Sequence, residues 1–219
     1  MNHFEALLSR YPMLSVCADD IQKAEDMMCK AYVAGAKILV CGNGGSASDA
    51  AHIVGELMKG FLLRRPMKDE TKKKFEETLG EEAEIFSKNL QCGIPAIALD
   101  SQHALFTAYT NDVDADFVYA QQVFGYARPN DLFIGISTSG NSKNVVNAAK
   151  TAKALGISTV ALTGAKESRL SEICDCTIRV PETETFMVQE LHLPVYHYLC
   201  AEMEERIYGK KDQTITGNL

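Results

Sequence analysis

The sequence predicts an α/β fold in which helices cover a five-stranded parallel sheet. Five short runs of mostly apolar residues are each about strand length and are bounded by turn residues. Segments with apolar residues at helical spacing alternate with these runs, which is typical of a doubly wound α/β domain. Runs that are apolar on both faces are expected where helices cover both sides of a parallel sheet. Ligands of such domains bind beyond the carboxyl ends of the strands.

The expected elements follow in order along the chain. A long N-terminal helix is expected over 13–34, because apolar residues recur at helical intervals before Gly35, a stop signal. The expected strands are Lys37–Cys41, Ile94–Leu99, Leu132–Ile136, Ile157–Leu162 and Thr177–Val180. The other expected helices are Ser48–Gly60, Ala104–Phe124, Lys143–Leu155, Ser168–Ile173 and a C-terminal helix over 186–208, Phe186 to Tyr208. The tail KKDQTITGNL is expected to be a frayed end.

Segment 67–90 interrupts this alternation. It is rich in charged residues, and Phe75, Leu79 and Phe86 form one narrow apolar stripe at helical spacing. We interpret it as a helical insertion between the first helix of the sheet domain and the second strand. A solvated hairpin is the simpler interpretation, and a lid or a subunit contact is the alternative.

The composition limits the classes of function. The chain has 219 residues, of which 46% are hydrophobic and 23% charged, as in ordinary globular proteins. The net charge of −7 and the lack of a basic stripe argue against a dedicated nucleic-acid binder. No apolar run approaches the length of a membrane span. The seven cysteines are scattered and odd in number, and no signal peptide is visible, so we expect reduced thiols and a cytoplasmic protein.

A glycine-rich turn follows the first expected strand. Gly42, Gly44 and Gly45 let the backbone approach an anion closely, and Ser46 and Ser48 can bind it and cap the next helix. The N–H groups at that helix start would form a phosphate nest. The spacing is neither a dinucleotide fingerprint nor a P-loop, so no nucleotide cofactor is expected. A plain tight turn is the alternative.

A second polar loop follows the third expected strand. Ser137, Thr138, Ser139 and Ser142 lie within six residues, just before a helix. Hydroxyls at this density, together with the helix N-terminus, can satisfy the oxygens of a phosphate without a cation. A serine-rich helix cap is the alternative. Two such loops, each after a parallel strand, favour the phosphate site.

Two helices carry titratable side chains. His52 and Glu56 lie one turn apart, which suits a proton-transfer pair, half a metal site or a simple surface contact. The last helix presents Gln189, Glu190, His192 and His197. Glu190 and His197 share a face, but Pro194 is expected to kink the helix and blur the angles. Helix geometry therefore leaves open whether Gln189 or Glu190 belongs with His197.

Together these segments resemble the sugar isomerase (SIS) domain family, and within it the phosphoheptose isomerase group. The matching segments are GNGGSASDAAHIVGEL, PAIAL, ND, GISTSGNSKNV, ALTG and IRVP with VQELH and a later His. The resemblance implies one SIS domain over 1–219, a three-layer α/β/α sandwich, and a homotetramer with active sites at subunit interfaces.

The resemblance also assigns roles to residues. It implies that Glu56 and His197 are the acid/base residues, and that a phosphorylated sugar is the partner. The sugar phosphate would be surrounded by Gly44 and Ser46 of the glycine turn and by Ser137, Thr138, Ser139 and Ser142 of the second loop. Asn43 and Asp112 would lie beside the sugar. His52, Glu56, Gln189 and His197 match positions that hold zinc in some members, which favours Gln189 over Glu190.

Three departures from the family pattern concern the substrate. Such isomerases carry Gly-Arg one turn after the catalytic Glu, whereas this chain has Lys59-Gly60. The insertion at 67–90 is absent from the usual heptose enzymes, and Thr185-Phe186 stands where a more polar neighbour of Gln189 is expected.

The resulting expectation is an aldose–ketose isomerase of a phosphorylated sugar such as sedoheptulose 7-phosphate. Proton transfer through an ene-diol and carbonyl polarisation by zinc compete as mechanisms, because a Glu that ligates zinc is less free to act as a base. An amino-sugar phosphate isomerase is a further possibility. A non-catalytic sugar-phosphate sensor or protein adaptor of the same family is the alternative from another class.

Overall fold

Five parallel strands form the centre of the computed structural model, which describes residues 2–209. They are β1 (Ile38–Cys41), β2 (Ala96–Ala98), β3 (Leu132–Ile136), β4 (Ser158–Thr163) and β5 (Cys176–Arg179), in the order β2-β1-β3-β4-β5. All four pairings are parallel, and Ile38 lies opposite both Ala96 and Leu132. The predicted five-stranded parallel sheet is therefore confirmed, with β2 shorter than expected. The expected frayed end lies outside the described residues.

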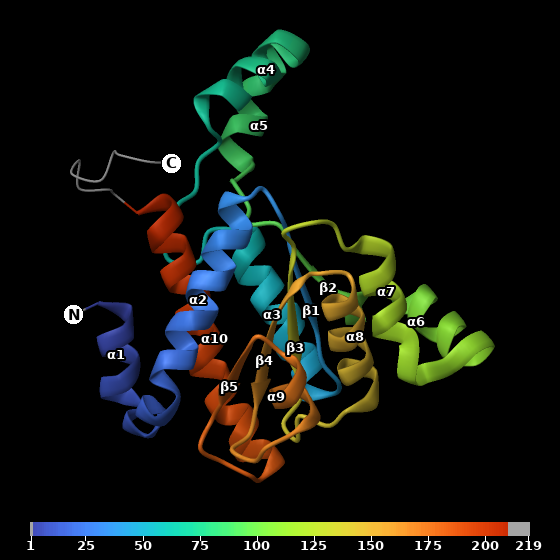
Figure 1. Ribbon diagram of the computed structural model, residues 1–219. Coiled ribbons are helices and arrows are strands. Elements are labelled where there is room, and N and C mark those ends of the chain that lie inside the picture. Colours follow the sequence, from blue (N-terminus) through green and yellow to red (C-terminus); the bar gives the residue numbers. More distant parts are fainter. Residues whose placement is uncertain (1, 210–219) are drawn as a thin grey trace.

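Helices cover both faces of the sheet, which makes three layers (Figure 1). One face packs against α2 (Ala18–Val33), α3 (Gly45–Met58) and α10 (Thr185–Tyr208), and the other against α7 (Val118–Tyr126), α8 (Lys143–Ala154) and α9 (Arg169–Ile173). Side chains of β1 alternate between the two layers: Ile38 and Val40 join the first core, and Leu39 and Cys41 the second. The α/β/α sandwich is confirmed.

The strand order places a switch point between β1 and β3. The chain leaves β1 into α3 on one face of the sheet and leaves β3 into α8 on the other face. The loops at the carboxyl ends of these two neighbouring strands therefore diverge and leave a crevice, where open α/β sheets bind their ligands. Both polar loops singled out in the sequence lie at this crevice.

The expected helix over 13–34 was wrong in its first turn and missed a separate helix. The chain begins with α1 (His3–Arg10), continues through a 3-10 turn, η1 (Pro12–Cys17), and only then enters α2. Pro12 stands at the start of η1. Met13 and Val16 are 50% and 73% exposed, so they do not belong to the buried stripe that their spacing suggested.

The single helix expected over Ala104–Phe124 was also wrong. The structure has α6 (His103–Tyr109), a π-helical turn η4 (Thr110–Asp114), a 3-10 turn η5 (Ala115–Phe117) and then α7. The break has a local cause, because Asp114 has an extended backbone and its carboxylate accepts the N–H of Asp116. A short 3-10 turn, η3 (Leu99–Ser101), precedes α6, which projects from the side of the domain (Figure 1).

The insertion is a helical hairpin that stands away from the sheet (Figure 1). It consists of α4 (Asp69–Leu79), the 3-10 turn η2 (Gly80–Glu82) and α5 (Ala83–Asn89). The rings of Phe75 and Phe86 pack against each other with centroids 5.8 Å apart, so the apolar stripe closes on itself. Pro66 and Gln91 form a β-bridge at the base, which brings the two ends of the hairpin together.

Replacing 69–89 with a short Gly/Ser bridge is expected to leave a folded domain. The base of the hairpin is already closed at Pro66 and Gln91, and surface connections tolerate changes in length. Far-ultraviolet circular dichroism and urea unfolding of the shortened chain measure the outcome. An insoluble product would show that the hairpin is part of the core or of a subunit interface.

Two further properties of residues 2–209 bear on the class of protein. Within this range no helix has the length and apolar character that a membrane crossing requires. All seven cysteines are free thiols, and most of them are buried.

Candidate active site

The turn after β1 is built by glycines that allow close approach. Gly44 has φ +58° and is the N-cap of α3, which starts at Gly45, three residues earlier than expected. A Cβ on Gly42 would lie 2.5 Å from the Ser46 carbonyl oxygen, so a side chain has no room there. The N–H of Ser46 donates to the Asn43 carbonyl, and those of Ala47 and Ser48 donate to the Gly44 carbonyl. These three N–H groups are therefore used within the turn and are not free to bind an anion there.

Backbone hydrogen bonds tie the serine loop after β3 to the end of β4 and the residue that follows it. The Ser137 N–H donates to the Leu162 carbonyl, and the Gly164 N–H donates to the Thr138 carbonyl. The hydroxyls of Ser137 and Ser142 lie 3.0 Å apart, and Ser142 is the N-cap of α8. Ser139 is exposed at the tip of the loop. Two of the four predicted hydroxyls, those of Ser137 and Ser142, thus lie together at the start of a helix, where an anion is favoured.

Two asparagines join the loops. The side-chain amide of Asn43 donates to the Asn144 oxygen at 2.8 Å, and that of Asn144 donates back to the Asn43 oxygen at 2.9 Å. Asn144 also accepts the Val145 N–H in the first turn of α8. Asn43, predicted to lie beside the sugar, therefore also fixes the spacing of the two loops. Asn144 was missed, although it lies directly after the serine motif.

Helix α10 approaches the glycine turn through Gln189. A Cβ added to Gly45 would lie 2.2 Å from the Gln189 amide nitrogen, so this side chain packs directly on the turn. Glu190 is exposed, so of the two side chains it is Gln189 that contacts the glycine turn. His192 is buried beside the end of β4, with Nε2 3.3 Å from the Thr163 carbonyl oxygen, and burial lowers its pKa to about 4. His192 is therefore neutral and structural.

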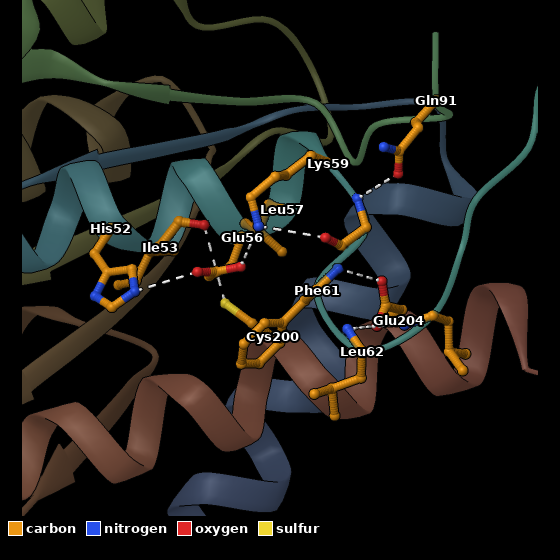
Figure 2. Close-up of polar contacts among 12 residues, drawn as sticks. His52, Ile53, Glu56, Leu57, Lys59, Phe61, Leu62, Gln91, Cys200 and Glu204 are labelled. Atoms are coloured by element: carbon orange, nitrogen blue, oxygen red, sulfur yellow. Dashed lines mark hydrogen bonds and ion pairs between the residues drawn. The ribbon is translucent and has the colours of Figure 1, made fainter. Parts of the chain in front are cut away.

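The Glu56 carboxylate is held at both oxygens, as Figure 2 shows. Oε1 lies 3.2 Å from Nε2 of His52, and Oε2 lies 2.9 Å from Nζ of Lys59. The Glu56 side chain is only 13% exposed, whereas that of His52 is 42% exposed. The predicted His52–Glu56 pair is thus a real contact, and it fixes the direction in which the carboxylate points.

His197 of α10 completes this cluster from the facing helix. Its ring lies edge-on to that of His52, with centroids 4.9 Å apart, and 5.7 Å from the ring of Phe61. Burial and the neighbouring His52 lower the pKa of His197, and the charge of Glu56 offsets this only in part. The imidazole is therefore neutral near pH 7 and able to accept a proton.

A buried ion pair, the Arg65–Glu204 clamp, holds the segment after Glu56. Both side chains are fully buried, and Arg65 Nε lies 2.6 Å from Glu204 Oε1. Arg65 also donates to the carbonyls of Glu56 and Leu57 in the last turn of α3. Glu204 accepts three backbone N–H groups of the following loop, from Phe61, Leu62 and Leu63, two of which Figure 2 labels. The clamp thus ties the end of α3 to α10, and no sequence pattern pointed to it.

Asp112 is a predicted site residue whose hydrogen bond is local. It lies exposed on η4, where it accepts a hydrogen bond from the side chain of Asn111. Within residues 2–209, no hydrogen bond or ion pair joins it to the other predicted site residues.

The four residues suggested for zinc do not form a metal site here. In the described part of the chain, no three His, Cys, Asp or Glu side chains are placed to hold a metal ion together. His52 uses Nδ1 toward the Tyr196 hydroxyl at 3.0 Å and Nε2 toward Glu56. Gln189 packs on the glycine turn, about 12 Å of helix rise from His197. This arrangement does not fit a zinc ion.

Comparison with known proteins identifies the family. Two SIS domain models match the chain, over residues 3–89 and 96–199. Phosphoheptose isomerase 2 of Campylobacter jejuni is 38% identical over 190 residues, which cover 87% of this chain and 82% of that protein. The chain belongs to the SIS domain family, in its phosphoheptose isomerase group. The predicted resemblance is confirmed.

Other members of the SIS family agree with this assignment. The phosphoheptose isomerase of Aneurinibacillus thermoaerophilus is 35% identical over 211 residues, covering 96% of this chain and 91% of that protein. The solved structure of a phosphoheptose isomerase from Neisseria gonorrhoeae superposes with a TM-score of 0.70 at 29% identity, covering 92% of this chain and 95% of that one. The SIS match therefore extends over nearly the whole fold.

Proposed function

We propose that this chain is an aldose–ketose isomerase of a phosphorylated sugar such as sedoheptulose 7-phosphate. The observation that carries the proposal is that Glu56 of α3 and His197 of α10, on facing helices, both contact His52. The Glu56 carboxylate is fixed by His52 and Lys59, and His197 packs edge-on to His52. The names of the relatives in the phosphoheptose isomerase group support the same reaction.

In this proposal the phosphate binds at the serine loop. Ser137, Thr138, Ser139 and Ser142 supply hydroxyls at the N-terminus of α8, and Ser46 lies across the crevice at the start of α3. Asn43, on the turn that lies between the two parts of the site, and Gln189, which packs on that turn from α10, would contact the sugar. Binding one end of an open-chain sugar orients the other end, which removes part of the barrier by positioning.

Glu56 and His197 share the two proton transfers of the isomerisation. One takes the proton from the carbon next to the carbonyl group, and the other moves the proton at the carbonyl oxygen, through an ene-diol. Each positioned acid or base contributes about 10²–10⁴-fold to the rate. The contacts of Glu56 to His52 and Lys59 hold its carboxylate in one orientation before the substrate arrives.

Zinc belongs to the competing version of this mechanism. The metal would polarise the carbonyl group if His52, Glu56, Gln189 and His197 held it together. Because these residues are not gathered around one point, we derive no step through a metal.

A proton-exchange assay in heavy water tests the proposed function. The protein, as purified, is incubated with a panel of phosphorylated ketoses and aldoses, and deuterium at the carbon next to the carbonyl group is followed by NMR. Exchange with a heptose phosphate supports the proposal, and binding without exchange would indicate a sensor or adaptor instead. Repeating the assay after chelation and after adding zinc separates the two mechanisms, because the acid/base version keeps its activity without metal.

Ser137→Ala and Ser139→Ala are each expected to weaken substrate binding. A hydrogen bond to a charged oxygen contributes about 1.5–3 kcal/mol, which corresponds to a loss of about 10- to 150-fold in affinity. Calorimetric titration with the sugar phosphate measures it. Ser158→Ala is the matched control, because Ser158 is the first residue of β4 and lies at the amino ends of the strands, away from the loops at their carboxyl ends. Parent-like affinity in both loop variants would show that the phosphate binds elsewhere.

The remaining expectations are part of the same proposal. We propose one SIS domain over 1–219 that forms a homotetramer with active sites at the subunit interfaces, in the cytoplasm, without a nucleic-acid partner. The exposed apolar side chains Phe186, Met187 and Leu193 on α10, beside Gln189 in the sequence, support an assembly that covers this helix.

A further inference from the structure

Tyr196 occupies a position that no part of the reaction explains. It lies on α10 next to His197 and is almost fully buried. Its hydroxyl lies 3.0 Å from Nδ1 of His52, on the side of the ring opposite the Glu56 contact. Both nitrogens of His52 are therefore engaged, one by Tyr196 and the other by the proposed catalytic carboxylate.

Asp49 engages the other side of the same hydroxyl. Asp49 lies one helical turn before His52 on α3, and its Oδ1 lies 3.3 Å from the Tyr196 hydroxyl oxygen. A hydroxyl group accepts one hydrogen bond while it donates another, so Tyr196 serves both partners at once. The second Asp49 oxygen is buried and has no hydrogen-bond partner among the described residues. A buried, half-satisfied carboxylate is costly, so its contact with Tyr196 is expected to be kept.

Ring packing adds to the hydrogen bonds. The Tyr196 ring lies 5.4 Å from that of His52 and 5.0 Å from that of His197, in both cases edge to face. His52 is half exposed, so without these contacts its ring would be free to rotate. The series Asp49, Tyr196, His52 and Glu56 thus links the buried interior to the carboxylate.

We propose that Tyr196 and Asp49 are positioning residues for catalysis, which hold His52 in the orientation that fixes the Glu56 carboxylate. This inference rests on the proposed function, because it assigns the residues that support the catalytic pair. Tyr196 acts on His52 directly, and Asp49 acts only through the Tyr196 hydroxyl.

Tyr196→Phe tests the role of the hydroxyl, since it retains the ring. We expect kcat to fall about five- to tenfold with KM unchanged, as for the loss of one hydrogen bond. The matched control is Tyr198→Phe, which removes another buried hydroxyl from α10 that binds Glu25. In ¹⁵N NMR, the Nδ1 signal of His52, assigned by its loss in His52→Gln, should shift in Tyr196→Phe and stay in place in Tyr198→Phe.

Asp49 is tested by a conservative and a truncating variant. Asp49→Ala should lower kcat as much as Tyr196→Phe does. Asp49→Asn should keep the parent kcat, because it retains an acceptor oxygen. The double variant, Asp49→Ala with Tyr196→Phe, should lower kcat no further than either single variant does. Additive losses, or unchanged kcat and His52 signals in Tyr196→Phe, would overturn the proposal. A parent protein without exchange activity would instead contradict the proposed function, while the His52 signals would still report on the positioning.

Discussion

Glu56→Gln is expected to abolish turnover while leaving the fold and substrate binding intact. The amide is nearly isosteric with the carboxylate and still reaches His52 and Lys59, but it cannot accept the proton of the substrate. The loss of one positioned acid or base predicts a fall in kcat of about 10²–10⁴-fold. Isomerisation of the sugar phosphate and deuterium exchange in heavy water both measure it.

Glu190→Gln is the matched control for this variant. It makes the same chemical change on an exposed carboxylate next to Gln189 and should retain parent activity. Calorimetric titration of both variants separates binding from chemistry, because only Glu56→Gln should bind substrate without converting it. Full activity in Glu56→Gln would remove Glu56 from the mechanism.

Glu204→Gln is expected to destabilise the protein by about 3–5 kcal/mol, the usual cost of breaking a buried ion pair. The substitution leaves Arg65 charged and fully buried without its partner. It also weakens the acceptor for the three N–H groups of the loop after α3. The free energy of unfolding in urea measures the effect, and Glu205→Gln, on the exposed side of the same helical turn, is the control.

Replacing both partners should not restore stability. Apolar pairs often substitute well for buried ion pairs, but here the loop N–H groups would lose their acceptor as well. Parent-like stability of Arg65→Met with Glu204→Leu would show that the clamp is dispensable.

The stability difference should also depend on pH. Burial acts to raise the pKa of Glu204, but hydrogen bonds from Phe61, Leu62, Leu63 and Arg65 outweigh it, and the pKa is lowered. A carboxyl with a lowered pKa in the folded state stabilises the protein fully above its unfolded pKa, near 4.3, and loses this contribution as the pH falls through the folded value. The parent and Glu204→Gln should therefore converge in stability under strongly acidic conditions.

The sequence predicted the sheet and the loops well because both depend on local patterns. The run Leu132–Ile136 is a strand with the expected bounds, and the serine motif directly after it leads into α8. The apolar spacing predicted one helix over Ala104–Phe124, but a local cap interrupts it. The carboxylate of Asp114 caps a new turn inside this segment, although the segment has helical periodicity. Pro12 similarly set the start of a 3-10 turn that the apolar pattern did not indicate.

The partners of the site residues could not be predicted in the same way. Asn43 pairs with Asn144, His52 with Tyr196, and Arg65 with Glu204, each more than one hundred residues away in sequence. Only the packing of α3 against α10 and the strand order bring these side chains together. Single residues of the right chemistry were visible, whereas the contacts that orient them were not.

The bridge between Pro66 and Gln91 has a consequence for how the sheet assembles. Pairing of β2 with β1 requires the long segment between them to close, and the hairpin lies within that segment. Loop closure costs only about 0.6 kcal/mol for each doubling of length, and less when the extra residues form a locally closed unit. The hairpin can thus fold independently, with little effect on the rate at which β1 and β2 pair. A segment of this kind is free to change in length during evolution while the sheet keeps its order.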